Sequence, residues 1–299
     1  MPVVSGLTNP ELFPIYYERK LLQFVKQNLP VLNYGQKFSL PKNSGRTAIF
    51  TRFVPLPIAT TPITNQPTPT SGANISTLQV NVQINEYGNY IDLDEFTDIT
   101  SFTPIMDNAI DLLSYNAQQS LHNVATSILT AGTNVIYAGG QTSRSALTGT
   151  YTLTKTEIRE ATTQLMRADI PPFPDGNYIC FVHPDKIMNL FTDQELIQLS
   201  LTRRDPIEKG YIGELLGVKF ILSTAMPIVP NGNSTTPANV YQTIIVGSNA
   251  YGVVDLDGTT LQTTYTNLDK LGRVKTVGWK AYFAISRLYE PAIVRIESN

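Results

Sequence analysis

The feature that most constrains the fold is a pair of alternating segments within residues 46–95. On the return side, apolar Val80, Val82 and Ile84 alternate strictly with polar neighbours, and Leu78 begins the series. The outgoing side around Phe50, Arg52 and Phe53 has the same period of two, which predicts two β-strands with one apolar face. Five prolines between the two segments predict a long, semi-extended tip instead of a tight turn.

Such a hairpin needs a partner, because an isolated two-stranded ribbon is marginally stable in water. Between Phe53 and Ile91 the only charged side chain is Glu86, so this surface can be buried at low desolvation cost. Two interpretations remain open from the pattern alone. The hairpin packs on its own domain, or it docks on a neighbouring subunit.

A long helix is predicted over residues 104–131. Thr103 is a suitable N-cap, Pro104 suits the first turn, and Gly132 suits the end of the helix. The polar face carries amides, with Asp107 and Asp111 as its only ionised groups. The apolar side chains recur at helical spacing and define an expected buried face: Ile105, Ala109, Leu112, Leu113, Ala117, Leu121, Val124 and Ile128. Of these, Leu113, Leu121 and Val124 are expected to form the core of the helix packing.

The remaining segments complete an α+β chain. Residues 1–45 are interrupted by five prolines, and only residues 16–28 have helical spacing, with Leu21, Leu22 and Val25. We therefore expect this segment to lie on another surface. Residues 150–265 are typical of a compact α/β region, beginning with a capping-box pattern at Thr154 and Glu157. Residues 274–297 form a long β-rich stretch in which Pro291 is expected at an edge or a bulge.

The composition favours a chain that lies among other protein. Hydrophobic residues make up 42%, enough for a core, whereas charged residues make up only 15% against about 25% in an average protein. The net charge of −2 argues against a dedicated nucleic-acid binder. No apolar run is long enough to span a membrane, and residues 1–10 do not have the pattern of a signal peptide. The single cysteine, Cys180, excludes an internal disulfide, and a cytoplasmic place of synthesis fits.

Motifs for chemistry are sparse, and no cofactor is expected. The sequence has no phosphate-binding loop and no dinucleotide fingerprint. Cys180, His183 and Asp185 could suggest a nucleophile site, but side chains three apart on a strand point to opposite faces, so Cys180 is expected to be a buried apolar residue. His122 has no second ligand at helical spacing and is expected to be a packed histidine.

An acidic cluster follows the alternating segments. It could hold a divalent ion, although a solvated corner between hairpin and helix is the favoured interpretation. Its members are Asp92, Asp94, Glu95 and Asp98.

Several short motifs, taken in order, resemble the major capsid proteins of tailed bacteriophages, which have the Hong Kong 97-type capsid fold. The resemblance covers nearly the whole chain, from an arm through a hairpin and a spine helix to an axial domain. The motifs are YYERKLL at 16–22, YGQK at 34–37, PKNSG at 41–45, RF at 52–53 with PLP at 55–57, EYGNYI at 86–91, VHPD at 182–185 and IGELLGV at 212–218.

The resemblance implies an N-terminal arm at 1–45, an extended loop at 46–95, a peripheral domain at 96–150 and 266–299, and an axial domain at 151–265. It implies contacts between subunits through the arm and the loop. The residues expected there are Tyr17, Leu21, Phe50, Arg52, Phe53, Leu78, Val80, Val82 and Ile84.

The resemblance also implies partners. The chain would form hexamers and pentamers of an icosahedral shell in the virion, around double-stranded DNA contacted without sequence specificity. A separate scaffolding protein and a portal protein are expected, decoration proteins are compatible with it, and no membrane is involved. Some shells of this fold are cross-linked from a loop lysine, but residues 53–91 contain no lysine. Two alternatives stay open: another self-assembling subunit, of a surface layer or tail tube, or an enzyme using Cys180 and His183.

Overall fold

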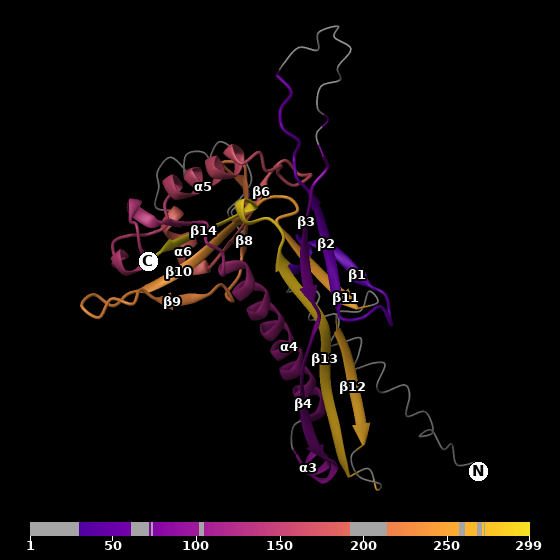
Figure 1. Ribbon diagram of the computed structural model, residues 1–299. Helices are drawn as coiled ribbons and strands as arrows, with labels where there is room; N and C mark the ends of the chain where they lie inside the picture. Colours follow the sequence, from indigo (N-terminus) through magenta and orange to yellow (C-terminus); the bar gives the residue numbers. More distant parts are fainter. Residues whose placement is uncertain are drawn as a thin grey trace.

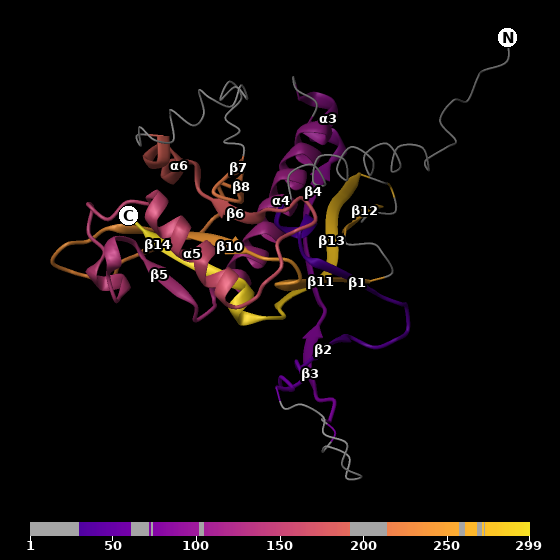
Figure 2. The same cartoon turned by 90° about the horizontal axis from the view of Figure 1, so that it is seen from above.

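The computed structural model describes residues 30–60, 72, 74–101, 105–191, 214–256, 261–267, 271 and 273–299. A compact part contains a seven-stranded sheet, a rod extends from it along the helix α4 (Ile105–Thr130), and a hairpin projects from the junction (Figure 1). Seen from above, the compact part and the strands of the rod lie on opposite sides of α4 (Figure 2). The molecule is therefore elongated.

The compact part is built on a mixed sheet. Helix α5 (Lys155–Arg167) packs against its strand β14, and the predicted capping box forms, since the amide of Thr154 donates to Oε2 of Glu157 at 2.9 Å. Helix α6 (Pro184–Phe191) follows the fully buried strand β6. The strand order is β5 (Val135–Tyr137), β14 (Ile293–Ser298), β10 (Asn239–Val246), β6 (Tyr178–Val182), β8 (Val218–Leu222) and β7 (Glu214–Leu215), with β9 (Ile228–Pro230) also paired to β10. Two short 3-10 helices, η1 (Ala138–Gly140) and η2 (Arg144–Ala146), follow β5.

The rod contains a second sheet of five strands centred on β13 (Val274–Arg287), which is 14 residues long. Strand β4 pairs antiparallel with β13 over ten residues, and β1 pairs parallel with β11. Its other strands are β1 (Gln36–Leu40), β11 (Tyr251–Leu256), β12 (Leu261–Asn267) and β4 (Asn85–Asp94).

The two sheets share one continuous C-terminal stretch. The expected β-rich segment 274–297 is broken at the 3-10 helix η4 (Glu290–Ala292), which contains Pro291. Strand β13 before it belongs to the rod, and β14 after it belongs to the compact part. Proline lacks the N–H that a continuous ladder requires, so the stretch changes sheets there.

Helix α4 packs along β13 and β4 with one face buried. Leu113 and Leu121 are buried and Val124 is half-buried in this packing. The expectation for Leu112 is wrong, because its side chain is 65% exposed while Ile110 is fully buried. At about 100° per residue, Leu112 lies roughly 200° around the helix from Ile110, so the two cannot share a face.

The segment expected to be one hairpin divides in two. Strand β2 (Thr47–Phe53) pairs with β3 (Thr77–Gln83), with Ala48 opposite Val82 and Phe50 opposite Val80. Beyond Ile84 the chain leaves this ladder, and β4 joins β13 instead. Pairing of β4 with the 14-residue strand β13 takes the place of a longer ladder between β4 and β2. The short helix α3 (Glu95–Thr100) then turns the chain towards α4.

Part of the expected arm is built into its own subunit. Val31 and Leu32 of α2 (Pro30–Asn33) are buried, as is Leu40 of β1, and the hydroxyl of Tyr251 donates to the carbonyl of Val31. The proline pattern did not predict this packing. Residues 1–29 lie outside the described residues.

Candidate assembly surface

The root of the hairpin is anchored in its own subunit. Phe50, Val82 and Ile84 are buried in a cluster with Val254 and Ala284 of the five-stranded sheet. A Cβ atom at Gly252 of β11 would lie 2.6 Å from the tip of the Phe50 ring, so the glycine leaves the room that this ring occupies. For the root, packing on the same chain is the interpretation that the structure supports.

At the upper limit of this anchored part, the Arg52 guanidinium lies 3.3 Å from the centre of the Tyr289 ring. Val80 is half-buried on the same face of the hairpin. This stacking is a cation–π contact that joins the hairpin to the segment between β13 and η4. Sequence reasoning selected Arg52 but missed Tyr289, since nothing in the pattern relates two residues so far apart in the chain.

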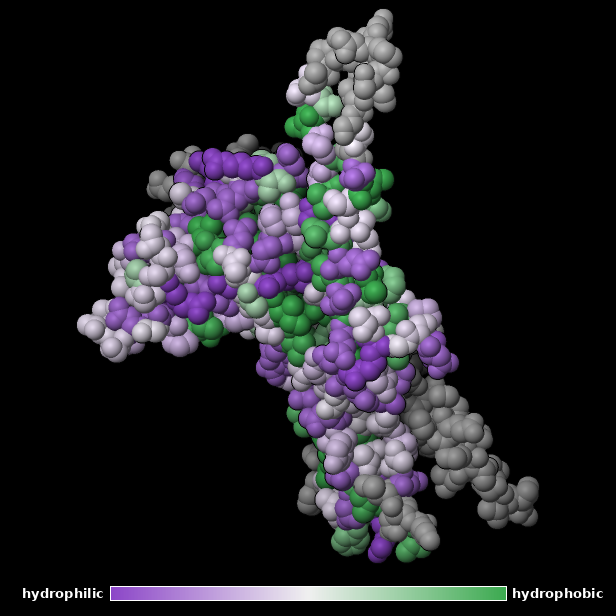
Figure 3. Space-filling view, viewed as in Figure 1, coloured by the Kyte–Doolittle hydropathy of each residue, from purple (hydrophilic) through white to green (hydrophobic). Residues whose placement is uncertain are grey.

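Beyond Arg52 the hairpin carries apolar side chains that face solvent, as the green atoms along its stem show (Figure 3). Phe53 is 67% exposed and Leu78 is 57% exposed. Their neighbours towards the tip continue the surface, namely Leu56, Ile58 and Ile75. Phe53 pairs with Thr77 and Arg52 with Leu78, so Phe53 and Leu78 lie on opposite faces of the ribbon and both faces are apolar. Exposed apolar surface of this extent is rare in monomeric soluble proteins. This distal surface, defined as Phe53, Leu56, Ile58, Ile75 and Leu78, is therefore suited to burial against another chain.

Two expected contact residues, Tyr17 and Leu21, lie outside the described residues. Sequence reasoning missed Leu56, Ile58 and Ile75 of the distal surface, because it treated the proline-rich stretch as a loop. The signal that could have found them was the run of apolar side chains without any charge.

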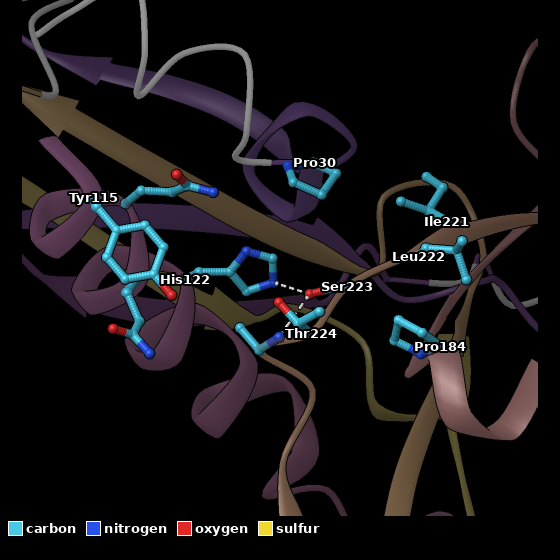
Figure 4. Close-up of a pocket in the computed structure, with 11 residues that line it drawn as sticks. Pro30, Tyr115, His122, Pro184, Ile221, Leu222, Ser223 and Thr224 are labelled. Carbon is cyan, nitrogen blue, oxygen red and sulfur yellow. Dashed lines mark hydrogen bonds between the residues drawn. The ribbon is translucent and has the colours of Figure 1, made fainter. Parts of the chain in front are cut away.

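A groove separates α4 from the turn that follows β8 (Figure 4). It encloses about 360 Å³. Nε2 of His122 lies 2.9 Å from Oγ of Ser223, and the hydroxyl of Thr126 donates to the carbonyl of Ala225 at 3.3 Å. Burial lowers the pKa of His122 to about 4, so the ring is neutral at pH 7. The groove is lined by Pro30, Tyr115, Gln118, Gln119, His122, Pro184, Ile221, Leu222, Ser223, Thr224 and Ala225.

These two contacts of His122 and Thr126 connect the rod to the compact part. The buried ring agrees with the expectation of a packed histidine. The described residues that line the groove carry amides, hydroxyls and apolar groups, and none of them is charged. Its chemistry favours a peptide over a charged small molecule.

The arrangement around Cys180 gives no support to a nucleophile site. Cys180 is fully buried, and burial raises the pKa of its thiol, so the reactive thiolate is disfavoured. Nδ1 of His183 accepts a hydrogen bond from the amide of Asp185 at 3.3 Å, which directs this ring nitrogen to its own helix start. The thiol is a core group of β6.

The acidic corner is held by internal bonds. Each of its carboxylates accepts from a donor of the same chain, and no group of acidic, histidine or cysteine side chains in the described ranges has the arrangement of a metal site. The partners are Thr276 for Asp92 (2.6 Å), the Thr97 amide for Asp94 (3.3 Å), Lys275 for Glu95 (3.2 Å) and the Met106 amide for Asp98 (3.4 Å).

A family model described as phage capsid protein matches residues 77–296. The chain belongs to the phage capsid protein family. No curated protein sequence matches the chain. Family membership gives it a structural role in building phage capsids.

Solved capsid structures share the fold of this phage capsid protein. The capsid of Ralstonia phage GP4 matches with a TM-score of 0.71 at 15% identity, covering 89% of this chain and 87% of that one. The head structure of Helicobacter pylori bacteriophage KHP40 matches with a TM-score of 0.69 at 14% identity, covering 88% and 86%. For the cyanophage Pam1 capsid the values are 0.69, 14%, 89% and 88%. The predicted α+β, Hong Kong 97-type capsid fold is thereby confirmed.

Among the helices that the structure describes, none is both long and apolar enough to cross a bilayer.

Proposed function

We propose that this protein is the major capsid protein that assembles through hexamers and pentamers into an icosahedral shell around double-stranded DNA. The observation that carries the proposal is the hairpin, whose root is buried in its own subunit while its distal surface is exposed. Because this part of the hairpin projects from the body of its own subunit, its apolar side chains can be buried only against another molecule.

Within this proposal the hairpin residues have two roles. Phe50, Val82 and Ile84 fix the root, Arg52 and Val80 set the direction in which the hairpin leaves the body, and Phe53 and Leu78 contact the next subunit. Tyr17 and Leu21 of the arm make a second contact between subunits. Head-to-tail contacts close into rings and extend into lattices, and several weak contacts per subunit act together.

The domain ranges follow the same proposal. The arm comprises residues 1–45 and the extended loop 46–95. The peripheral domain comprises 96–150 and 266–299, centred on the spine helix with Leu113, Leu121 and Val124. The axial domain comprises 151–265 and lies around the centre of each hexamer or pentamer.

The proposed partners are a separate scaffolding protein and a portal protein, and decoration proteins are compatible with the outer surface. The chain is assembled in the host cytoplasm and then resides in the virion. Its net charge of −2 suits a container, because a strongly basic wall would bind the packaged DNA tightly through counterion release. We assign the chain no catalytic role, no cofactor and no metal.

Negative-stain microscopy of the purified chain, alone and with its scaffolding protein, tests this function. Closed shells of uniform diameter are expected. Tubes or flat sheets would instead support a tail-tube or surface-layer subunit. An activity that is lost in Cys180→Ala would support the enzyme alternative.

A further inference from the structure

The loop between β9 and β10 contains the only Asn-Gly pair in the sequence, Asn231 followed by Gly232. The loop lies at one end of the compact part, as the orange segment beside β9 shows (Figure 1). Gly232 has a φ of +74°, a left-handed conformation that glycine adopts without strain. Asn231 is buried, with an exposed fraction of 3%. The backbone turn therefore favours a glycine directly after a buried asparagine.

The side-chain amide of Asn231 uses its whole hydrogen-bonding capacity. Nδ2 donates to the carbonyls of Leu147 and Thr236, both at 2.8 Å. Oδ1 accepts from the backbone amides of Asn233 at 3.1 Å and Ala238 at 3.3 Å. A carboxamide has two N–H donors and two acceptor lone pairs, so these four bonds hold it on every side.

The bond to the Leu147 carbonyl joins this loop to a second one. The Leu147 side chain is buried with Ala138 and Val240 in a small cluster that is separate from the main core. The two loops therefore form one packed unit, here called the polar tip (residues 138–150 and 231–239). The Asn231 amide lies between them and can move freely only when they separate.

An asparagine followed by glycine can modify itself, because no Cβ atom on the glycine hinders the approach of backbone to side chain. The backbone nitrogen of Gly232 attacks Cγ of Asn231. A bond forms between these two atoms, the Cγ–Nδ2 bond breaks, and Nδ2 leaves as ammonia with the proton of the backbone nitrogen. Water then opens the cyclic imide and leaves an aspartate or an isoaspartate at position 231.

The closed polar tip opposes the first of these steps. Attack requires Cγ of Asn231 to turn onto the following nitrogen and to become tetrahedral. The four hydrogen bonds hold the amide planar and in place. Local opening of a loop is the kind of motion that removes such a constraint without unfolding the rest of the chain.

We propose that Asn231 is a self-modification site that stays intact while the polar tip is closed and is converted when the tip opens, with water as the only co-reactant. This goes beyond the proposed capsid function and does not depend on it. Conversion runs in one direction, because a carboxylate has no N–H to donate. The carbonyls of Leu147 and Thr236 would then face a buried negative charge, so the modified tip cannot close as before.

Mass spectrometry of the full chain tests the protection. The protein is kept in mildly alkaline buffer, either folded or unfolded in urea, and conversion of amide to acid is followed in the peptide that contains Asn231. Because opening breaks four hydrogen bonds together, we expect conversion to be at least about tenfold slower in the folded chain. Equal rates in the two samples would overturn the proposal.

Two variants that loosen the polar tip separate local opening from global unfolding. Leu147→Ala removes a fully buried side chain, and Asn233→Ala removes the bond from its Nδ2 to the Ser145 carbonyl at 3.2 Å. Each should speed conversion of the folded chain by about threefold or more. The matched control, Leu113→Ala, removes a buried leucine of α4 and should not. If neither tip variant is faster, or if the control is equally fast, the tip is not what protects Asn231.

Hydrogen exchange tests whether conversion prevents closure, with Asn231→Asp as the imitation of the product. Peptides from the polar tip should exchange faster than in the unsubstituted chain, while peptides from β13 should be unchanged. Asn233→Asp makes the same change at a half-buried position and should have a smaller effect. Exchange that rises in β13 as much as in the tip, or that rises in neither, would overturn the one-way step.

Discussion

Arg52 of β2 stacks on Tyr289 at 3.3 Å, at the place where the hairpin leaves the body of the subunit. Below this pair one face of the hairpin is buried, with Phe50 and Val82, while Ile49 on the other face is exposed; above the pair the apolar side chains are exposed. The pair therefore separates the part of the hairpin that stabilises the subunit from the part available to a neighbour.

Replacing Arg52 by alanine should affect assembly more than folding. A cation–π contact at a partly exposed site contributes about 0.5–1 kcal/mol, so the melting temperature should fall only slightly. Shell yield by light scattering should fall more, because the hairpin loses its fixed direction. Arg52→Lys is the control and should retain part of the yield. Equal assembly by Arg52→Ala and the unsubstituted protein would contradict this role.

The buried His122 should make the subunit sensitive to acid. Its pKa of about 4 lies below the ordinary value of 6.5, so between these pH values the unfolded chain takes up a proton that the folded chain does not. Stability contributed by this group is therefore lost as the pH falls from 6.5 to 4, by about 3 kcal/mol. Thermal melts at pH 7 and pH 4.5 of the protein and of His122→Gln measure the effect. The variant should lose less stability between the two pH values, and parallel losses would contradict the assignment.

The two sides of α4 should respond differently to truncation. Leu113→Ala and Leu121→Ala each remove a buried side chain and should lower the free energy of unfolding by about 2–5 kcal/mol. Leu112→Ala and Gln119→Ala, at exposed positions of the helix, should change it by less than about 0.5 kcal/mol. Urea unfolding of the four variants decides the matter, and similar small effects at all four positions would mean that the buried face is assigned incorrectly.

Removing the hairpin tip should separate folding from assembly. When a short Gly-Ser turn replaces residues 56–76, the ladder of β2 and β3 remains, and Val82 and Ile84 stay covered by Val254 and Ala284. The circular-dichroism spectrum and the melting transition should be retained, while shells are lost. Aggregation of the variant would mean that the tip covers its own subunit, and normal shells would remove the distal surface from the assembly contacts.

Shells of this protein should be held together without covalent bonds. The stretch from Phe53 to Ile91 contains no lysine, so the amine required for an isopeptide link is missing from the extended loop. Mature particles boiled in detergent should give one band at the monomer mass. A ladder of dimers, pentamers and hexamers would contradict this prediction.

Sequence patterns within a segment predicted its strand or its buried helix face, whereas pairing between segments far apart in the chain could not be predicted. Alternation at Val80 and Val82 predicted β3, and the spacing of Leu113 and Leu121 predicted the buried face of α4. The end of the hairpin at Ile84 could not be predicted, because it depends on the pairing of β4 with β13, about 190 residues later in the chain, as in Tyr90 opposite Gly278.

The assembly surface was only partly accessible to sequence reasoning for the same reason. Alternation predicts which hairpin side chains share a face, but it does not say how far along the hairpin the body of the subunit reaches. That limit is set by Tyr289 and Ala284, which lie on the other side of the fold. Pattern alone therefore grouped Val82 and Leu78 together, although one is buried in its own subunit and the other is exposed.

The break at η4 makes the C-terminal stretch a mechanical joint. Strand β13 carries the rod and the hairpin root, strand β14 runs through the compact sheet, and the chain between them is only residues 288–292. Glu290 braces this joint, accepting from the Thr133 amide at 2.7 Å and pairing with Arg287 at 3.4 Å. Bending of one half of the subunit against the other would load these residues together with residues 247–250, which join β10 of the compact sheet to β11 of the rod. The curvature that a sheet of such subunits can adopt would thus depend in part on five residues that also hold the hairpin, because Tyr289 among them stacks on Arg52.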